Sequence, residues 1–157
     1  MTTKRSTWQE KLANDKGLPK VEAIPDKMSK KWGEGTVAIP ASKEIDDIMK
    51  KVPRGKLITI NDIRRSIAGR HGASIGCPMT TGIFAWIAAS AAAEEEAEGK
   101  EQITPYWRTL KSGGELNPKY PGGVEGQRAR LEAEGHRVVP RGKKYVDEDF
   151  EKSLIQL

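Results

Sequence analysis

The chain is most informative at residues 59–80, which read TINDIRRSIAGRHGASIGCPMT. Thr59 followed three residues later by Asp62 resembles a capping box, in which each side chain accepts a hydrogen bond from the other residue's backbone N–H. Behind this cap, Ile63 and Ile67 recur at helical spacing, so they share one face of a helix. The first half of the stretch therefore predicts a short amphipathic helix.

The second half predicts a turn followed by a longer helix. Residues 69–72, Gly-Arg-His-Gly, supply the turn. The next helix is expected to start between Ser74 and Pro78, because proline is tolerated only in a first helical turn. It runs through Phe84 and ends near Gly99. Two helices joined by a tight turn form a helix-turn-helix.

Apolar stripes predict further helices on both sides of this pair. Ser42 is expected to cap the preceding helix. The buried face of that helix consists of Ile45, Ile48, Met49 and Val52. A later helix is predicted around Val124, Arg128 and Leu131, and it ends at Gly135.

A small β-hairpin is predicted near the end of the chain. Residues 137–139 and 144–146 flank a Pro-Arg-Gly-Lys turn, which is typical of a hairpin. Asp147 is then expected to cap a last helix that buries Phe150 and Leu154. A hairpin that follows a helix-turn-helix is the pattern of a winged helix, in which the second helix enters a groove of nucleic acid.

The chain divides into two unequal parts at residue 41. Residues 1–41 mix Lys, Asp, Gly and Pro with no sustained hydrophobic period, which favours a basic N-terminal arm that is partly extended. Within it, residues 36–39 predict a short strand. Residues 42–157 hold the helical patterns and are expected to form one domain.

The composition fits a protein that binds a polyanion. Of the 157 residues, 27 are Lys or Arg and 22 are Asp or Glu, which gives a net charge of +5. This balance suits nucleic acid, although an ordinary solvated surface gives the same number. Cys77 is the single cysteine, which excludes an internal disulfide and fits a reducing cytoplasm. No Cys/His spacing indicates a metal site, and no cofactor is implied.

One stretch has the length of a membrane span. Residues 72–93 are 22 consecutive uncharged positions. Gly76, Pro78 and several Thr and Ser residues dilute the stretch, and much of the remainder is alanine. A half-buried helix is therefore favoured over a membrane span.

Three segments together resemble the DNA-binding domain of the alkylguanine-DNA alkyltransferases. Residues 52–63, VPRGKLITINDI, resemble the segment that opens that domain, and residues 105–109, PYWRT, lie where the family has Pro-Cys-His-Arg-Val. Residues 119–124, KYPGGV, and 131–135, LEAEG, match its substrate loop and the following helix. The resemblance covers roughly residues 45–135.

The resemblance implies a winged helix-turn-helix-like fold, mainly α with a small β-hairpin. The family has a short link between the recognition helix and the Pro-Cys-His-Arg-Val segment. This chain has a long inserted helix instead, at about residues 82–103. We do not expect the family's separate N-terminal domain in this sequence, because about 40 residues cannot build it.

The family's nucleophile is absent from this chain. The reactive Cys, which the family activates through a His-water-Glu relay, corresponds to Tyr106, and the His corresponds to Trp107. Glu134 matches the Glu. A phenol with a pKa of about 10 is a poor nucleophile, and an indole cannot relay protons. The resemblance is therefore to the non-catalytic alkyltransferase-like branch, whose members bind alkylated guanine in DNA and flag it for repair without being enzymes.

The resemblance also assigns candidate binding residues on double-stranded DNA. The pocket for a damaged base would be lined by Tyr106, Trp107, Tyr120 and Glu134. DNA contacts are expected from the recognition-helix segment, a later loop and the first helix of the pair, namely Ser74, Gly76, Met79, Thr80, Lys111, Ser112, Arg64 and Arg65. A small residue such as Gly76 lets a helix approach a groove closely, but it serves tight packing equally well.

Three further departures favour a second hypothesis, a regulatory or protein-interaction module on the same fold. Ala73 corresponds to the family's intercalating arginine, and Ile60 to the tyrosine that rotates the nucleotide. Pro121 corresponds to the serine that holds the guanine oxygen. Base flipping costs a few kcal/mol of unstacking, so the loss of these groups weakens lesion recognition.

The inserted helix supplies a surface for that second hypothesis. Residues 82–98 end in glutamates at positions 94, 95, 96 and 98, which are expected to face solvent or a repair or regulatory protein and to avoid DNA. A third, enzymatic hypothesis needs another nucleophile. Cys77 lies far from the family's pocket, and neither His71 nor His136 has an identifiable partner in the sequence.

Overall fold

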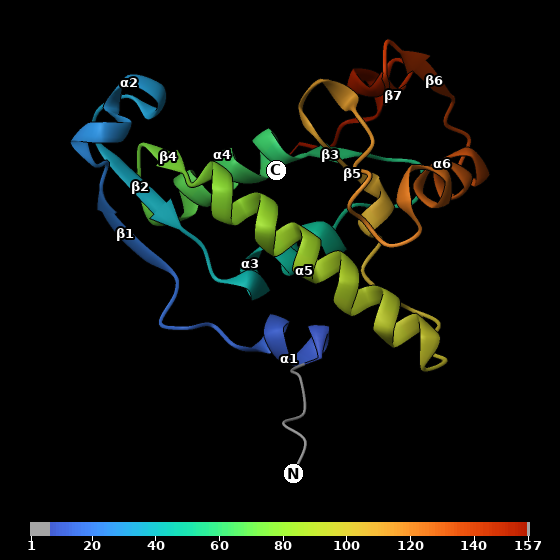
Figure 1. Cartoon of the computed structure of the whole chain (residues 1–157), viewed down its shortest axis with the longest axis horizontal. Helices are drawn as coiled ribbons and strands as arrows, with labels where there is room; N and C mark the ends of the chain where they lie inside the picture. Colours follow the sequence, from blue (N-terminus) through green and yellow to red (C-terminus); the bar gives the residue numbers. More distant parts are fainter. Residues whose placement is uncertain (1–6, 157) are drawn as a thin grey trace.

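The long helix α5, Pro78–Ala97, is the element around which the rest of the chain is arranged (Figure 1). The structure is a computed structural model that describes residues 7–156. Helices α1 (Trp8–Ala13), α3 (Ser42–Lys50) and α4 (Ile60–His71) all contact α5. The start of α5 at Pro78 and its end close to Gly99 agree with the sequence prediction.

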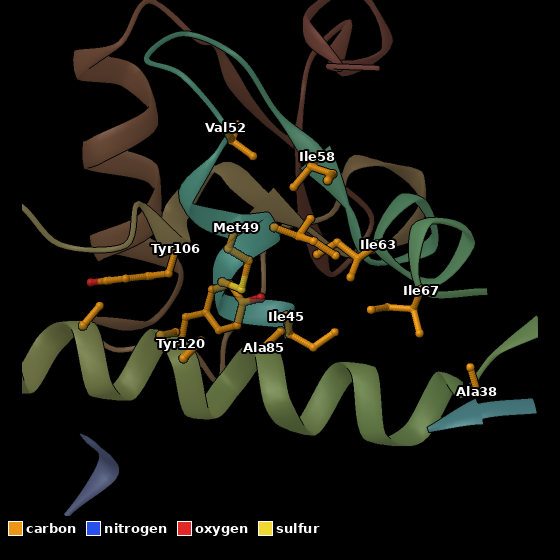
Figure 2. Close-up of a cluster of buried hydrophobic side chains, with 14 residues drawn as sticks. Ala38, Ile45, Met49, Val52, Ile58, Ile63, Ile67, Ala85, Tyr106 and Tyr120 are labelled. Atoms are coloured by element: carbon orange, nitrogen blue, oxygen red, sulfur yellow. The ribbon is translucent and has the colours of Figure 1, made fainter. Parts of the chain in front are cut away.

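The core forms where α3 and α4 meet the alanine-rich face of α5 (Figure 2). Every member of the predicted α3 stripe is buried, and so are Ile63 and Ile67 of α4. On α5 the residues buried in this core are Ala85, Ala88, Ala89 and Ala92. Small side chains let the isoleucines of α3 and α4 approach the α5 backbone closely, so the uncharged stretch is a core helix. Within residues 7–156, no helix has both the length and the hydropathy that a membrane crossing needs.

Of the three predicted helix caps, the one at Thr59 is confirmed and those at Ser42 and Asp147 are wrong. Thr59 and Asp62 form the expected capping box, with N–H to oxygen distances of 3.1 and 3.2 Å. Ser42 is already inside α3, and the cap position belongs to Ala41. The hydroxyl of Ser42 instead donates a hydrogen bond to the carbonyl of Leu12, at 2.8 Å, and so ties α1 to α3.

Residues 8–41, which were expected to include an extended arm, contain several regular elements. After α1 come β1 (Lys20–Ala23), η1 (Asp26–Met28), α2 (Ser29–Trp32) and β2 (Thr36–Ile39). Strand β2 confirms the strand predicted at 36–39. It pairs antiparallel with β1 and parallel with β4 (Ile75–Gly76), which lies in the turn between α4 and α5. The N-terminal segment is thereby joined to the helix pair, and the division at residue 41 stays a prediction.

Helix α1 covers part of the inserted half of α5. The rings of Trp8 and Trp86 meet edge to face with centroids 4.7 Å apart. Gln9 donates from its backbone N–H to Glu94 at 2.9 Å and from its side chain to Glu98 at 3.0 Å. Two glutamates of the acidic cluster are therefore used to hold α1 in place.

The C-terminal half builds a second core around α6, Gly123–Ala133. Before α6 lie η2 (Tyr106–Arg108), β5 (Thr109–Leu110) and η3 (Ser112–Gly114), and β5 pairs parallel with β3 (Ile58–Thr59). After α6, β6 (Val138–Arg141) and β7 (Lys144–Asp147) form the predicted hairpin. The fold is therefore mainly α with small β-sheets, as the sequence predicts.

The end of the chain differs from the prediction in one respect. Asp147 does not cap a helix, because it is the last residue of β7 and its buried carboxylate lies 3.2 Å from the Nδ1 of His136. The following element is a short 3₁₀ helix, η4 (Phe150–Ser153). Phe150 and Leu154 do pack against the second core.

A pair of glycine substitutions tests the close approach of α4 to β4. A Cβ at Gly76 would lie within 3.1 Å of three backbone atoms of Arg64, so Gly76→Ala forces the two backbones apart. We expect a loss of about 1–3 kcal/mol in the free energy of unfolding, measured by urea denaturation. Gly82→Ala is the control, because nothing lies within 4 Å of its Cβ position. There alanine should stabilise the helix by about 0.5–1 kcal/mol. Equal stabilities of the two variants would contradict the close contact.

Candidate functional site

An open cleft of about 290 Å³ lies between the first half of α5 and the loop that follows β5. One wall is apolar and belongs to α5, and the other belongs to the loop and is basic. The lining residues are Met79, Gly82, Ile83, Trp86, Lys111, Asn117, Pro118 and Lys119. Apolar and cationic side chains on facing walls suit a ligand that has both flat apolar groups and negative charge.

The apolar wall is unusual because it is exposed to solvent. Met79 is 64% exposed and Ile83 is 48% exposed, and among the other large apolar side chains of residues 7–156 only Val21 is also exposed. The two residues are four apart on α5, so they lie on the same face of the helix. Exposed apolar side chains rimmed by polar ones commonly mark a binding surface.

The basic wall is fixed by a buried glutamine that the sequence analysis did not single out. Gln127 of α6 accepts a hydrogen bond from the backbone N–H of Asn117 at 2.8 Å and donates one to the carbonyl of Trp107 at 3.1 Å. Its side chain is fully buried. The only signal in the sequence is a polar residue four positions before Leu131, on the buried face of α6.

The predicted pocket residues lie together, but their side chains fill the space between them. Tyr106 is 3% exposed and Tyr120 is 2% exposed. Their rings meet edge to face at 6.0 Å, and Tyr106 meets the ring of Trp107 at 5.3 Å. Both tyrosines belong to the main hydrophobic core (Figure 2). The structure therefore brings the predicted residues into one cluster, in which the two tyrosines are closed to solvent and Trp107 and Glu134 are partly buried.

Glu134 is the polar centre of this cluster. Its carboxylate accepts hydrogen bonds from Trp107 Nε1 at 2.8 Å, from the backbone N–H of Gly55 at 3.0 Å and from the guanidinium of Arg108 at 2.7 Å. Arg108 also donates to the carbonyl of Val52 at 2.7 Å. Burial opposes ionisation, but these hydrogen bonds outweigh it and hold the pKa of Glu134 below its usual range.

Arg130 of α6 covers the cluster from one side. Its guanidinium lies 4.5 Å from the ring centre of Trp107 and 5.6 Å from that of Tyr106. It also forms an ion pair with Glu96 of α5. The inserted half of α5 therefore contributes to the closure, and neither Arg108 nor Arg130 was singled out from the sequence.

The predicted DNA-contact residues fall into two groups. Met79 and Lys111 line the cleft, and Ser112 is exposed beside it at the start of η3. A second hollow of about 200 Å³ lies between α4 and β4, and Arg64, Arg65, Ser74 and Gly76 are among its lining residues. The hydroxyl of Thr80 is buried and lies in neither hollow.

Several members of the second group have structural partners. Ser74 accepts a hydrogen bond from the backbone N–H of Thr36 at 3.0 Å, and Arg64 donates to the carbonyl of Gly76 at 3.0 Å. Arg65 forms an ion pair with Asp62. Gly76 is thus required for close packing, which is one of the two functions that the sequence left open.

Cys77 lines neither the cleft nor the second hollow. Cys77 is buried with Ile24 and Val37 beneath the small sheet. Within residues 7–156, no group of three or more His, Cys, Asp or Glu side chains is arranged to hold a metal ion.

The buried Glu134 carboxylate makes the stability of the fold depend on pH. Because its pKa is lowered from 4.5 on folding, its contribution is complete above that pH and is lost as the pH falls through the lowered value. Glu134→Gln leaves the buried charge of Arg108 without its carboxylate partner. We therefore expect the free energy of unfolding to fall by about 3–5 kcal/mol at pH 7 and to depend less on pH in acid. Urea denaturation from pH 7 to pH 3 measures both effects. Glu132→Gln, which changes an exposed pair with Arg128, should behave like the wild type. An unchanged acid profile in Glu134→Gln would contradict the assignment.

Comparisons with known proteins identify the fold. No protein-family model and no curated protein matches the sequence. A solved structure of S. pombe Atl1 in complex with damaged DNA containing O6-carboxymethylguanine is similar with a TM-score of 0.51. The sequences are 18% identical, and the match covers 74% of this chain and 94% of that one. A structure of S. pombe ATL in complex with DNA matches with the same identity and coverage and a TM-score of 0.47. The chain therefore has a fold similar to that of Atl1.

Proposed function

We propose that this chain is a DNA-binding alkyltransferase-like protein that senses damaged guanine without transferring alkyl groups. The observation that carries the proposal is the cleft in which exposed Met79 and Ile83 face Lys111 and Lys119. It lies on the helix that resembles the family's recognition helix. The fold similarity to Atl1, which was solved bound to damaged DNA, supports the same function.

The two walls of the cleft match the two parts of a DNA groove. Lysines on the loop suit the phosphate backbone, which supplies most of the affinity of such proteins. Apolar side chains on α5 suit the sugars and bases inside a groove, where they act as wedges between base steps. In this arrangement α4, the turn and α5 are the helix-turn-helix, and the β6–β7 hairpin is the wing.

The cluster around Tyr106 is poorly suited to alkyl transfer. Burial raises the pKa of the Tyr106 phenol, although the nearby Arg130 partly offsets this effect. A nucleophilic phenolate would need a base, and Glu134 is already bound to Arg108, Trp107 and Gly55. The Tyr106 phenol therefore has neither the lowered pKa nor the adjacent base that would activate it as a nucleophile.

One observation favours the alternative, a regulatory or protein-interaction module. Tyr106 and Tyr120, which the resemblance assigns to the pocket for a damaged base, are buried against each other. The partner would use the inserted half of α5, residues 82–98, although α1 already covers part of this surface. Binding of duplex DNA separates the two hypotheses.

Removal of the two cleft lysines should weaken DNA binding through the phosphate backbone. We expect Lys111→Ala/Lys119→Ala to reduce the slope of log K against log salt concentration by about two, because each lost phosphate contact removes about 0.9. Fluorescence anisotropy with guanine and O6-methylguanine duplexes at several salt concentrations measures this. Lys50→Ala/Lys100→Ala is charge-matched and alters a different surface hollow, so its slope should be unchanged. Absence of duplex binding by the wild type at low salt would support the interaction module.

Incubation with DNA that contains O6-methylguanine tests the absence of alkyl transfer. We expect the mass of the intact protein to stay constant, because Tyr106 is a buried phenol and Cys77 is a buried thiol. Mass spectrometry before and after incubation measures the change. An active alkyltransferase is the positive control for the substrate. A gain of one methyl group on either residue would overturn the proposal.

A further inference from the structure

The residues that were predicted to line the pocket pack against one another. Tyr106 and Tyr120 are buried against each other, and Arg130 lies over Tyr106 and Trp107. The edge of Trp107 is bound to Glu134. A base that entered here would have to displace aromatic rings and break a buried network, both of which are costly.

The open cleft offers a different surface for a base, namely the indole of Trp86. Trp86 is one of the residues that line the cleft, and its ring meets the ring of Trp8 edge to face at an interplanar angle of 71°. The contact with Trp8 holds the ring in one orientation. Met79 and Ile83 continue the same wall toward the start of α5. The wall therefore has an aromatic platform at one end and two exposed aliphatic side chains at the other.

The polar groups of the cleft are poorly placed to read the edge of a base. The backbone N–H of Asn117 is bound to Gln127, and the Asn117 side-chain oxygen accepts the N–H of Lys119 at 3.0 Å. Pro118 has no N–H to donate. The ammonium groups of Lys119 and of Lys111, which lies 3.6 Å from the carboxylate of Glu115, remain. A point charge on a flexible stem suits phosphate rather than a base edge.

We propose that the cleft binds an unpaired nucleobase by stacking on Trp86, with the flanking phosphates on Lys111 and Lys119. The inference rests on the proposed DNA-binding function and specifies what the site recognises. Every base has a flat π face, so recognition by stacking tolerates any base. The protein then detects a base that has left the duplex stack, and it senses a damaged guanine because a damaged base leaves the stack at a lower cost.

The test uses the full chain and a duplex with a single bulged 2-aminopurine, whose fluorescence is quenched when it stacks on an indole. We expect the wild type to quench the probe and to bind the bulged duplex about tenfold more tightly than the fully paired one. Trp86→Leu should abolish the quenching and the preference, and it should keep the affinity for paired DNA. Trp32→Leu is the matched control, since Trp32 packs under the small sheet away from the cleft. Met79→Ala, at an exposed position, should reduce the preference without affecting the fold.

The outcomes separate this inference from the proposed function. Equal quenching by the wild type and Trp86→Leu would overturn the stacking site, and so would equal affinity of the wild type for bulged and paired duplexes. If Trp86→Leu fails to fold, an unchanged bulge preference in Met79→Ala and Ile83→Ala would overturn it. A preference for bulged O6-methylguanine over bulged guanine would also overturn it, because the base edge would then be read. Failure to bind any duplex would instead remove the proposed function itself.

Discussion

The buried carboxylate of Glu134 joins three parts of the chain that are distant in sequence. It binds the turn at Gly55, the η2 segment through Trp107 and Arg108, and its own helix end. Loss of any partner would leave a charge or a donor without compensation in a region closed to water, which is far more costly than loss of a surface pair. In the resembled enzymes the matching carboxylate belongs to a proton relay. In this chain the carboxylate holds these three parts together, and it fixes the position of Trp107 in the aromatic cluster.

The rest of the structure also depends on the long helix α5. A helix with so many alanines on its buried face gains little from any one side chain, so its stability comes from the elements that cover it. Helices α3 and α4 cover one side, and α1 contributes Trp8 and the hydrogen bonds of Gln9. The same helix exposes Met79 and Ile83 at its first turns. One continuous element thus supplies the core, the docking surface of the N-terminal segment and one wall of the cleft.

Periodic features could be predicted from the sequence, and features that depend on long-range contacts could not. The stripe on α3, the Thr59 capping box, the start of α5 and the C-terminal hairpin each follow from local spacing. The predicted role of Ser42 as a cap was wrong, because its hydroxyl meets the carbonyl of Leu12, 30 positions earlier. Asp147 was wrong as a cap for a similar reason, since β7 places it beside His136.

The candidate site shows the same division. The resemblance predicted that Tyr106, Trp107, Tyr120 and Glu134 line one pocket, and these residues do lie in one cluster. It could not show that the cluster is closed, because closure depends on Arg130 and on Glu96 from the inserted helix. The roles of Gln127, Ile83 and Trp86 likewise depend on neighbours that no local pattern specifies.

The contact between Trp8 and Trp86 has a thermodynamic consequence. A helix of six residues such as α1 is only marginally stable in water by itself, so its stability comes from its packing against α5. Because the docked ring is also a wall of the cleft, folding of the N-terminal turn and occupation of the cleft are linked equilibria. Such linkage is reciprocal. If a ligand stabilises Trp86 in its contact with Trp8, it stabilises the folded form of α1 by the same free energy. Fraying of α1 then weakens the binding of that ligand by the same amount.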